Sequence, residues 1–147
     1  MKKSAQYKIL PELKIMIEYF SVETTLNDMI EHRKILIKDK DYNPGFNFIT
    51  DFRDTILACS YDDILSYIEF AKKEPNMLGK RRAAILTETP NQTAISVLYV
   101  LNLHDLPFIV EIFSTMDAAI KWVGLSQNDK SIVEEIIKNM KAEINYL

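Results

Sequence analysis

Apolar and polar residues alternate near the start of the chain and then change to helical spacing. Residues 13–20 alternate between two faces, which is the period of a β-strand, and they follow a short apolar run at 7–10. This pair predicts an N-terminal β-hairpin. Apolar positions then recur every three or four residues over 26–37, after Thr25 and Asp28 at capping-box spacing. The pattern predicts a helix over about 25–38.

The rest of the chain repeats a strand pattern followed by a helix pattern. Short apolar runs predict strands at 46–50, 82–87 and 108–113. Each run precedes a hydroxyl residue suited to cap a helix, and a last helix follows Gly124. The predicted caps are Ser60 with Asp63, Thr89 with Gln92, Ser114 or Thr115, and Ser126 with Asp129. The predicted helices cover about 61–73, 89–103, 115–123 and 127–145.

This order of elements predicts a small α/β layer structure. Strands that alternate with helices form mostly parallel sheets with right-handed crossovers, here with an antiparallel N-terminal hairpin and helices packed on the sheet. A chain of 147 residues with 48% apolar content can build one core. We therefore expect a single domain over 1–147, with a core at about 7–124 and an extra C-terminal helix at about 127–145. That helix is expected to pack on its own sheet, with a second subunit or a partner as the alternative.

Composition excludes several classes of protein. No apolar run reaches the length of a membrane span, and residues 1–7 are polar, so we expect neither a membrane span nor secretion. The single cysteine, Cys59, fits a reducing compartment and a cytoplasmic location. A net charge of -3 argues against nucleic acid as a partner.

The usual catalytic and cofactor motifs are absent from the sequence. His32 and His104 lie far apart without metal-binding spacing, and three glycines cannot form a nucleotide-binding loop. The two histidines are predicted to be surface or interfacial side chains and not a general base. We predict no metal, no cofactor and no enzymatic activity. Cys59 lacks a neighbouring histidine, so an inert, partly buried thiol is favoured over a nucleophile.

A binding site, if present, is expected where the parallel strands end. Loops at the carboxyl ends of such strands share one edge of the sheet, and helix N-termini there favour a phosphate or carboxylate. The candidates at this edge are Asp51, Arg53, Asp54, Thr87, Thr89, Asn91, Ser114 and Thr115. The alternative interpretation, which we favour, is that the hydroxyls are helix caps and the charged residues pair with one another. The basic run 80–82 is interpreted as a solvent-exposed segment at the start of a strand. The alternative is that it attracts lipid headgroups or an acidic partner.

The element order, together with Phe48–Asp54 and Ala84–Thr87, resembles the STAS family of anti-sigma-factor antagonists. More closely, it resembles the uncharacterised bacterial STAS-like, or SpoIIAA-like, proteins over residues 7–124. The resemblance implies a non-enzymatic switch domain with a phosphorylated Ser or Thr before the second helix. The nearest position is Ser60, with Cys59 and Asp62 in place of the aspartate and glycine of the family motif.

Two functions follow from these features. The first is a regulatory or protein-interaction module of unknown physiological role, which binds a protein partner or self-associates. The alternative is a small-ligand domain that binds a lipid, a nucleotide or another anion in the crevice at the strand carboxyl ends.

Overall fold

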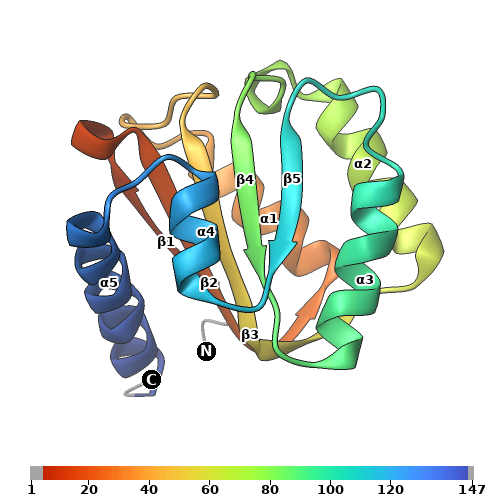
Figure 1. Ribbon diagram of the computed structural model, residues 1–147. Coiled ribbons are helices and arrows are strands. Elements are labelled where there is room, and N and C mark those ends of the chain that lie inside the picture. Colours follow the sequence, from red (N-terminus) through yellow and green to blue (C-terminus); the bar gives the residue numbers. More distant parts are fainter. Residues whose placement is uncertain (1–4, 146–147) are drawn as a thin grey trace.

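A computed structural model describes residues 5–145 as a five-stranded sheet flanked by helices (Figure 1). The strands lie in the order β1-β2-β3-β4-β5, so each is beside its neighbour in sequence. The strands are β1 (Ala5–Leu10), β2 (Ile15–Thr25), β3 (Asn47–Ala58), β4 (Arg82–Leu86) and β5 (Ile109–Phe113). The helices are α1 (Leu26–Leu36), α2 (Tyr61–Lys73), α3 (Pro90–Leu101), α4 (Met116–Trp122) and α5 (Gln127–Asn145).

The strand directions confirm the predicted mixed sheet. β1 and β2 are antiparallel, and β2 through β5 are parallel. The hairpin turns through a short 3-10 helix, η1 (Pro11–Leu13), which ends at Lys14 with a left-handed φ of 52°. A second 3-10 turn, η2 (Pro75–Met77), leads from α2 toward β4.

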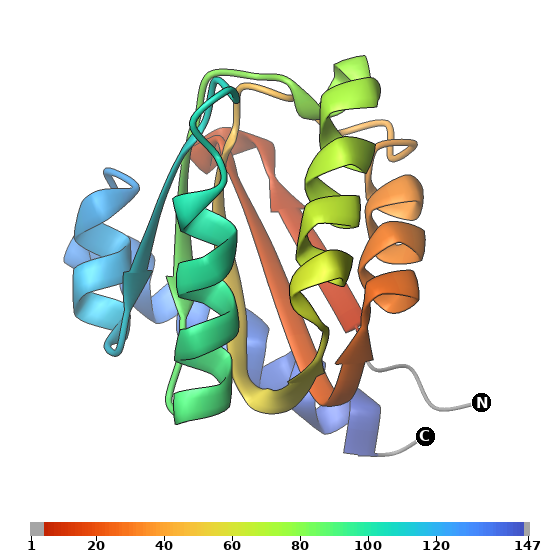
Figure 2. The same ribbon diagram turned by 90° about the vertical axis from the view of Figure 1, so that its right-hand side faces the viewer.

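Helices cover both faces of the sheet. In Figures 1 and 2, α1, α2 and α3 lie on one face, and α4 and α5 lie on the other. The alternation of side chains along each strand divides the core in the same way. In β2, Ile17 belongs to the core beneath α4 and α5, whereas Met16 and Phe20 belong to the opposite one.

The α4/α5 face is a continuous apolar core. The inner stripe of α5 is Val133, Ile137, Met140 and Ile144, all at most 5% exposed. They pack with the sheet and with α4, and Lys130 of α5 forms an ion pair with Asp117 of α4 at 2.7 Å. The C-terminal helix thus packs on its own chain, as the sequence favoured.

The predicted helix caps are present. Thr25, Ser60 and Thr89 form capping boxes with Asp28, Asp63 and Gln92. Thr115, not Ser114, caps α4, and Gly124 follows that helix with φ of 79°, a conformation that favours glycine. At the start of α5, the Ser126 N–H donates to the Asp129 carboxylate, and the Asp129 N–H donates to the Ser126 hydroxyl.

The predicted ends of two strands were wrong. β2 continues five residues beyond Phe20, to Thr25, and β3 continues from Thr50 to Ala58. β4 pairs with β3 only as far as Asp51, and beyond that point β3 pairs with β2 alone. The apolar pattern of the two strands weakens beyond Phe20 and Thr50 because the sheet there is only two strands wide. Asp51, Arg53 and Asp54 therefore lie within a strand and not in a loop.

Within residues 5–145, no helix has the length and apolar character needed to cross a membrane.

Candidate functional site

Asp51 and Arg53, predicted at the strand ends, pair with each other. Arg53 Nε and Nη2 donate to the two Asp51 carboxylate oxygens at 2.9 and 3.0 Å, and the Arg53 backbone N–H also donates to Asp51. The Asp51 carboxylate is fully buried. This fork-to-fork pair spans an irregularity in the register of β2 and β3, between Tyr19 and Ser21. The arginine charge here is therefore neutralised by the protein itself.

Asp54 connects the sheet to the C-terminal helix. It accepts a hydrogen bond from the Tyr19 hydroxyl at 2.7 Å and forms an ion pair with Lys141 of α5 at 3.1 Å. Burial raises the pKa of the Asp54 carboxyl, but the Tyr19 hydrogen bond and Lys141 outweigh burial, and the net pKa is lowered. Asp54 is thus a charged contact between β3 and α5.

The polar residues near the end of β4 support the unpaired side of β3. The Asn91 side chain accepts from the Leu57 N–H at 2.9 Å and donates to the Leu57 carbonyl at 3.1 Å, replacing a missing strand. Gln92 donates to the Thr55 carbonyl at 2.9 Å. Thr87 shares a hydrogen bond with Thr93, and Thr89 caps α3.

The predicted edge is thus occupied largely by internal contacts. Thr115 accepts from the Ala118 N–H as the α4 cap, and Ser114 beside it is exposed. Binding of an anion at this edge stays a prediction. Thr89 and Thr115 are helix caps and Asp51 pairs with Arg53, as the favoured interpretation expects, whereas Thr87 bonds to Thr93 and the α4 cap is Thr115 and not Ser114.

Ser60 and Cys59 lie at the start of α2. The Ser60 hydroxyl accepts from the Asp63 N–H at 3.1 Å, and its side chain is exposed. Cys59 is half-buried, and burial together with the charges of Asp63 and Asp28 raises the pKa of its thiol. A thiol with a raised pKa is mostly protonated at neutral pH and is a poor nucleophile.

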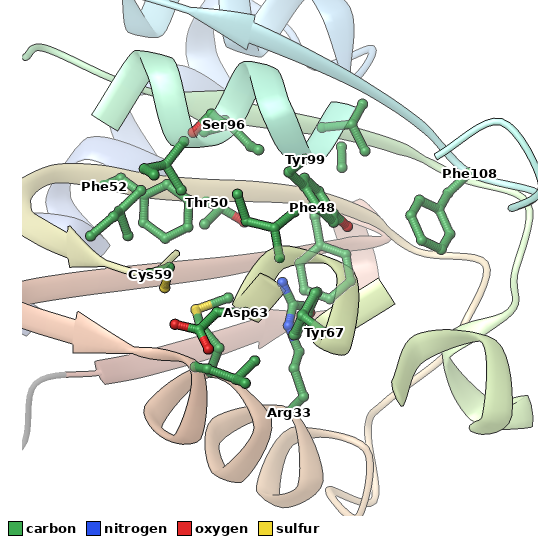
Figure 3. Close-up of a pocket in the computed structure, with 18 of the residues that line it drawn as sticks. Arg33, Phe48, Thr50, Phe52, Cys59, Asp63, Tyr67, Ser96, Tyr99 and Phe108 are labelled. Carbon is green, nitrogen blue, oxygen red and sulfur yellow. The ribbon is translucent and has the colours of Figure 1, made fainter. Parts of the chain in front are cut away.

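A cavity of about 90 Å³ lies between the sheet and helices α1, α2 and α3 (Figure 3). Three strands and three helices contribute to its wall, which is largely apolar. The apolar and aromatic part includes Leu26, Met29, Phe48, Phe52, Ile64, Tyr67, Ile95, Tyr99, Phe108 and Val110. Leu26, Met29, Cys59, Asp63 and Tyr99 remain partly exposed although they face the interior. The cavity is therefore not sealed from solvent.

A buried ionic cluster adjoins this cavity. Glu18 of β2 is 0% exposed and accepts from Thr50 at 2.8 Å, while Arg33 of α1 lies 2.9 Å from its Oε1. His32 Nε2 lies 2.9 Å from the other oxygen, Oε2. Burial raises the pKa of Glu18, but the Arg33 charge and these hydrogen bonds outweigh burial and lower it to about 2. Glu18 is thus ionised at neutral pH. His32 is buried, contrary to the prediction of a surface or interfacial histidine.

A second arginine, Arg81, is buried at the cavity wall. It is 8% exposed, and its guanidinium lies 4.6 Å from the Phe48 ring centre and 5.2 Å from that of Phe108. Arg33 also lies over Phe48, at 4.7 Å. Only part of the basic run at 80–82 is therefore solvated: Lys80 and Arg82 are exposed, whereas Arg81 is interior.

Several polar groups in the cavity wall lack partners or stay neutral. Ser96 is 2% exposed, and its Oγ has no hydrogen-bond partner among the described residues; the same holds for Arg33 Nε. Burial raises the pKa of the Tyr67 and Tyr99 phenols, so both keep their proton at neutral pH. Figure 3 shows Arg33 reaching from α1 toward Phe48 and Tyr67. The cavity thus offers donors to a guest inside an otherwise apolar wall.

Sequence reasoning did not find this cavity, although two signals pointed to it. Glu18 shares a face of its strand with Met16 and Phe20, and a charge on an apolar face needs a buried partner. Arg33 occupies an apolar position in the helical repeat of α1, which supplies that partner. No comparable signal marks Ser96, because a lone serine in a helix is common.

In the described part of the chain, no group of three or more His, Cys, Asp or Glu side chains comes close enough to hold a metal ion.

Comparison with known proteins shows the fold alone. No protein-family model matches the chain, and no curated protein matches it. The structure is similar to the crystal structure of an uncharacterized DUF3478-family protein from Shewanella loihica PV-4, described as having a SpoIIAA-like fold. The TM-score is 0.56 at 14% sequence identity, over 82% of this chain and 94% of the other. The chain therefore has a SpoIIAA-like fold.

Proposed function

We propose that this protein is a non-enzymatic binding module whose cavity beneath α1, α2 and α3 takes a small, mainly apolar molecule. The observation that carries the proposal is the cavity itself. Protein interiors are ordinarily packed without voids much larger than a water molecule, whereas about 90 Å³ is open here, well above the roughly 10–15 Å³ that one water needs. Unpaired polar atoms in the wall, such as Ser96 Oγ, add donors and acceptors for a guest.

The non-enzymatic part of the proposal rests on the ionisable groups. Cys59 has a raised thiol pKa, and the carboxylates of Glu18, Asp51 and Asp54 are each held by a cation and further hydrogen bonds. A general base needs a free, suitably placed proton acceptor, and these three carboxylates are engaged in ion pairs. Binding without chemistry fits this arrangement.

The test uses 1-hexanol and hexanoate as simple probes of the cavity. Either ligand should raise the midpoint of thermal unfolding, because a molecule that binds only the folded state stabilises it by mass action. Bound ligand should also slow alkylation of Cys59 by iodoacetamide, since this lone cysteine borders the cavity.

A cavity-filling variant separates this site from surface binding. Ala83 of β4 lines the cavity, so Ala83→Leu should abolish both effects. Ala94 is exposed on α3, and Ala94→Leu should preserve them. Absence of stabilisation by both probes in the wild-type protein, or binding that survives Ala83→Leu, would refute the proposal.

A second candidate function is a protein-interaction module, supported by the outer face of α2. Tyr61 and Leu65 are 48% and 37% exposed, one turn apart, next to the exposed Ser60. Phosphorylation of Ser60 would add up to about two negative charges beside Asp62 and Asp63, which should repel an acidic partner. This face could therefore bind a partner in a switchable way.

Intact-mass analysis after expression in the native host tests this second candidate. A phosphate should be present on the wild-type protein, retained in Ser66→Ala, which alters another exposed serine of α2, and lost in Ser60→Ala. An unmodified wild-type chain would count against the switch.

A further inference from the structure

The feature that specifies a ligand class is the buried charge of Arg81. Its Nη1 donates to the Tyr42 hydroxyl at 3.2 Å and the Pro44 carbonyl at 3.1 Å, and its Nη2 donates to the Met77 carbonyl at 3.4 Å. All three acceptors are neutral. Among the described residues, no carboxylate lies within 4.0 Å of this guanidinium. Arg81 is thus a buried cation without a counter-charge.

The neighbouring Arg33 provides an internal comparison. Both guanidinium groups lie over the Phe48 ring and border the cavity, but Arg33 has the Glu18 carboxylate at 2.9 Å. A buried charge is costly unless it is paired, and buried arginines are normally matched to an anion. One of the two cations beside Phe48 is therefore neutralised, and the other is not.

Arg81 also keeps hydrogen-bonding capacity for a guest. A guanidinium carries five N–H donors in a fork that fits a carboxylate or phosphate. The three contacts described above leave the Nε–H and one Nη2 N–H without a partner among the described residues. Beyond the guanidinium, the same cavity is walled by apolar and aromatic side chains such as Phe108 and Val110.

We propose that the cavity binds a small amphipathic acid, whose carboxylate or phosphate pairs with Arg81 while its apolar part lies among the aromatic side chains. This inference rests on the proposed function and adds the chemical class of the ligand. The guest supplies the missing negative charge, and the protein supplies a mainly apolar environment in which a charge-assisted hydrogen bond is strong.

The experiment compares matched ligands on the wild-type protein by isothermal titration calorimetry. Hexanoate and hexyl phosphate carry an anionic head, and 1-hexanol has the same chain without the charge. At least one of the acids should bind about tenfold more tightly than the alcohol, and the stronger of them identifies the head group. Equal affinity for acid and alcohol would overturn the inference while leaving the proposed function intact. No binding of any of the three would refute both.

Two adjacent arginines provide the variant and its control. Arg81→Gln should reduce the preference for acid over alcohol to near unity, and Arg82→Gln should preserve it, because Arg82 is exposed and lies over Trp122 outside the cavity. Should Arg81→Gln fail to fold, Arg81→Lys keeps the charge without the planar fork and should weaken acid binding several-fold. An undiminished acid preference in the folded Arg81 variant would overturn the assignment to this residue.

Discussion

The two faces of the sheet are built from the same strands but are packed differently. Beneath α4 and α5, the core is apolar and continuous, and Val133, Ala84 and Ala119 at its centre are fully buried. Beneath α1, α2 and α3 the interior contains a cavity, a buried Glu18–Arg33 pair and the uncompensated Arg81. Adjacent residues of one strand therefore have opposite roles: Ile17 packs with apolar neighbours, and Glu18 pairs with a cation.

Under the proposed function, this difference separates a stabilising face from a binding face. A well-packed core resists any change of volume, whereas a cavity with partly satisfied polar groups retains capacity to bind. The α4/α5 face is thus expected to supply stability. The α1–α3 face is packed less tightly, which leaves the open volume that the proposed site needs. Substitutions at matched positions on the two faces should show this contrast.

The largest expected effect comes from breaking the buried ion pair. Glu18→Gln leaves Arg33 buried without a counter-charge, and it should lower the free energy of unfolding at neutral pH by about 3–5 kcal/mol. Urea denaturation measures this change. Glu23→Gln, at an exposed position of the same strand, should have little effect. Adding Arg33→Met to Glu18→Gln should restore part of the loss, and no restoration would argue that the pair is not the cause.

Acid should destabilise the protein through the same group. The pKa of Glu18 is about 2 in the folded chain, against 4.5 ordinarily, so the unfolded chain takes up a proton first as the pH falls. This contribution is fully present above the ordinary pKa and is lost as the pH falls from there toward 2, by about 3 kcal/mol in all. Urea denaturation at several pH values should show this slope in the wild type and a shallower slope in Glu18→Gln. Equal slopes in the two proteins would contradict the assignment of this acid sensitivity to Glu18.

A smaller effect directly compares the two packings. Ala83 and Ala84 are neighbours in β4, but Ala83 lines the cavity and Ala84 is 0% exposed in the α4/α5 core. Ala84→Leu should cost about 1–3 kcal/mol by overpacking. Ala83→Leu should be neutral or stabilise by up to about 1 kcal/mol, because it fills open space. Similar losses in the two variants, measured by thermal unfolding, would show that both faces are tightly packed.

Local signals in the sequence predicted most of the fold. The helix starts at Thr25, Ser60 and Thr89 were predicted because a cap and its N3 partner lie within one turn of chain. The ends of the strands were not predicted, because the length of β3 depends on Asn91 and Gln92, which hydrogen-bond to its backbone from α3. Such support from a distant segment leaves no periodic pattern in the strand.

The candidate site was less predictable than the fold. A cavity is a property of several elements packed together, and its walls here come from segments between Leu26 and Val110. Arg81 stands in a basic run, which ordinarily indicates a solvated surface, and only the packing of Phe48 and Phe108 around it reveals its burial. Glu18 on an apolar strand face was the clearest available sign that this half of the core holds charges.

The most direct test of the contrast between the faces is a crystal of the protein pressurised with xenon, which enters apolar cavities and is easily located by diffraction. We expect xenon beside Phe52, Ile95 and Val110, in the cavity beneath α1, α2 and α3, and none between the sheet and α5. A crystal in which side chains fill the space beneath α1, α2 and α3, with no xenon there or with xenon only beneath α4 and α5, would contradict this account.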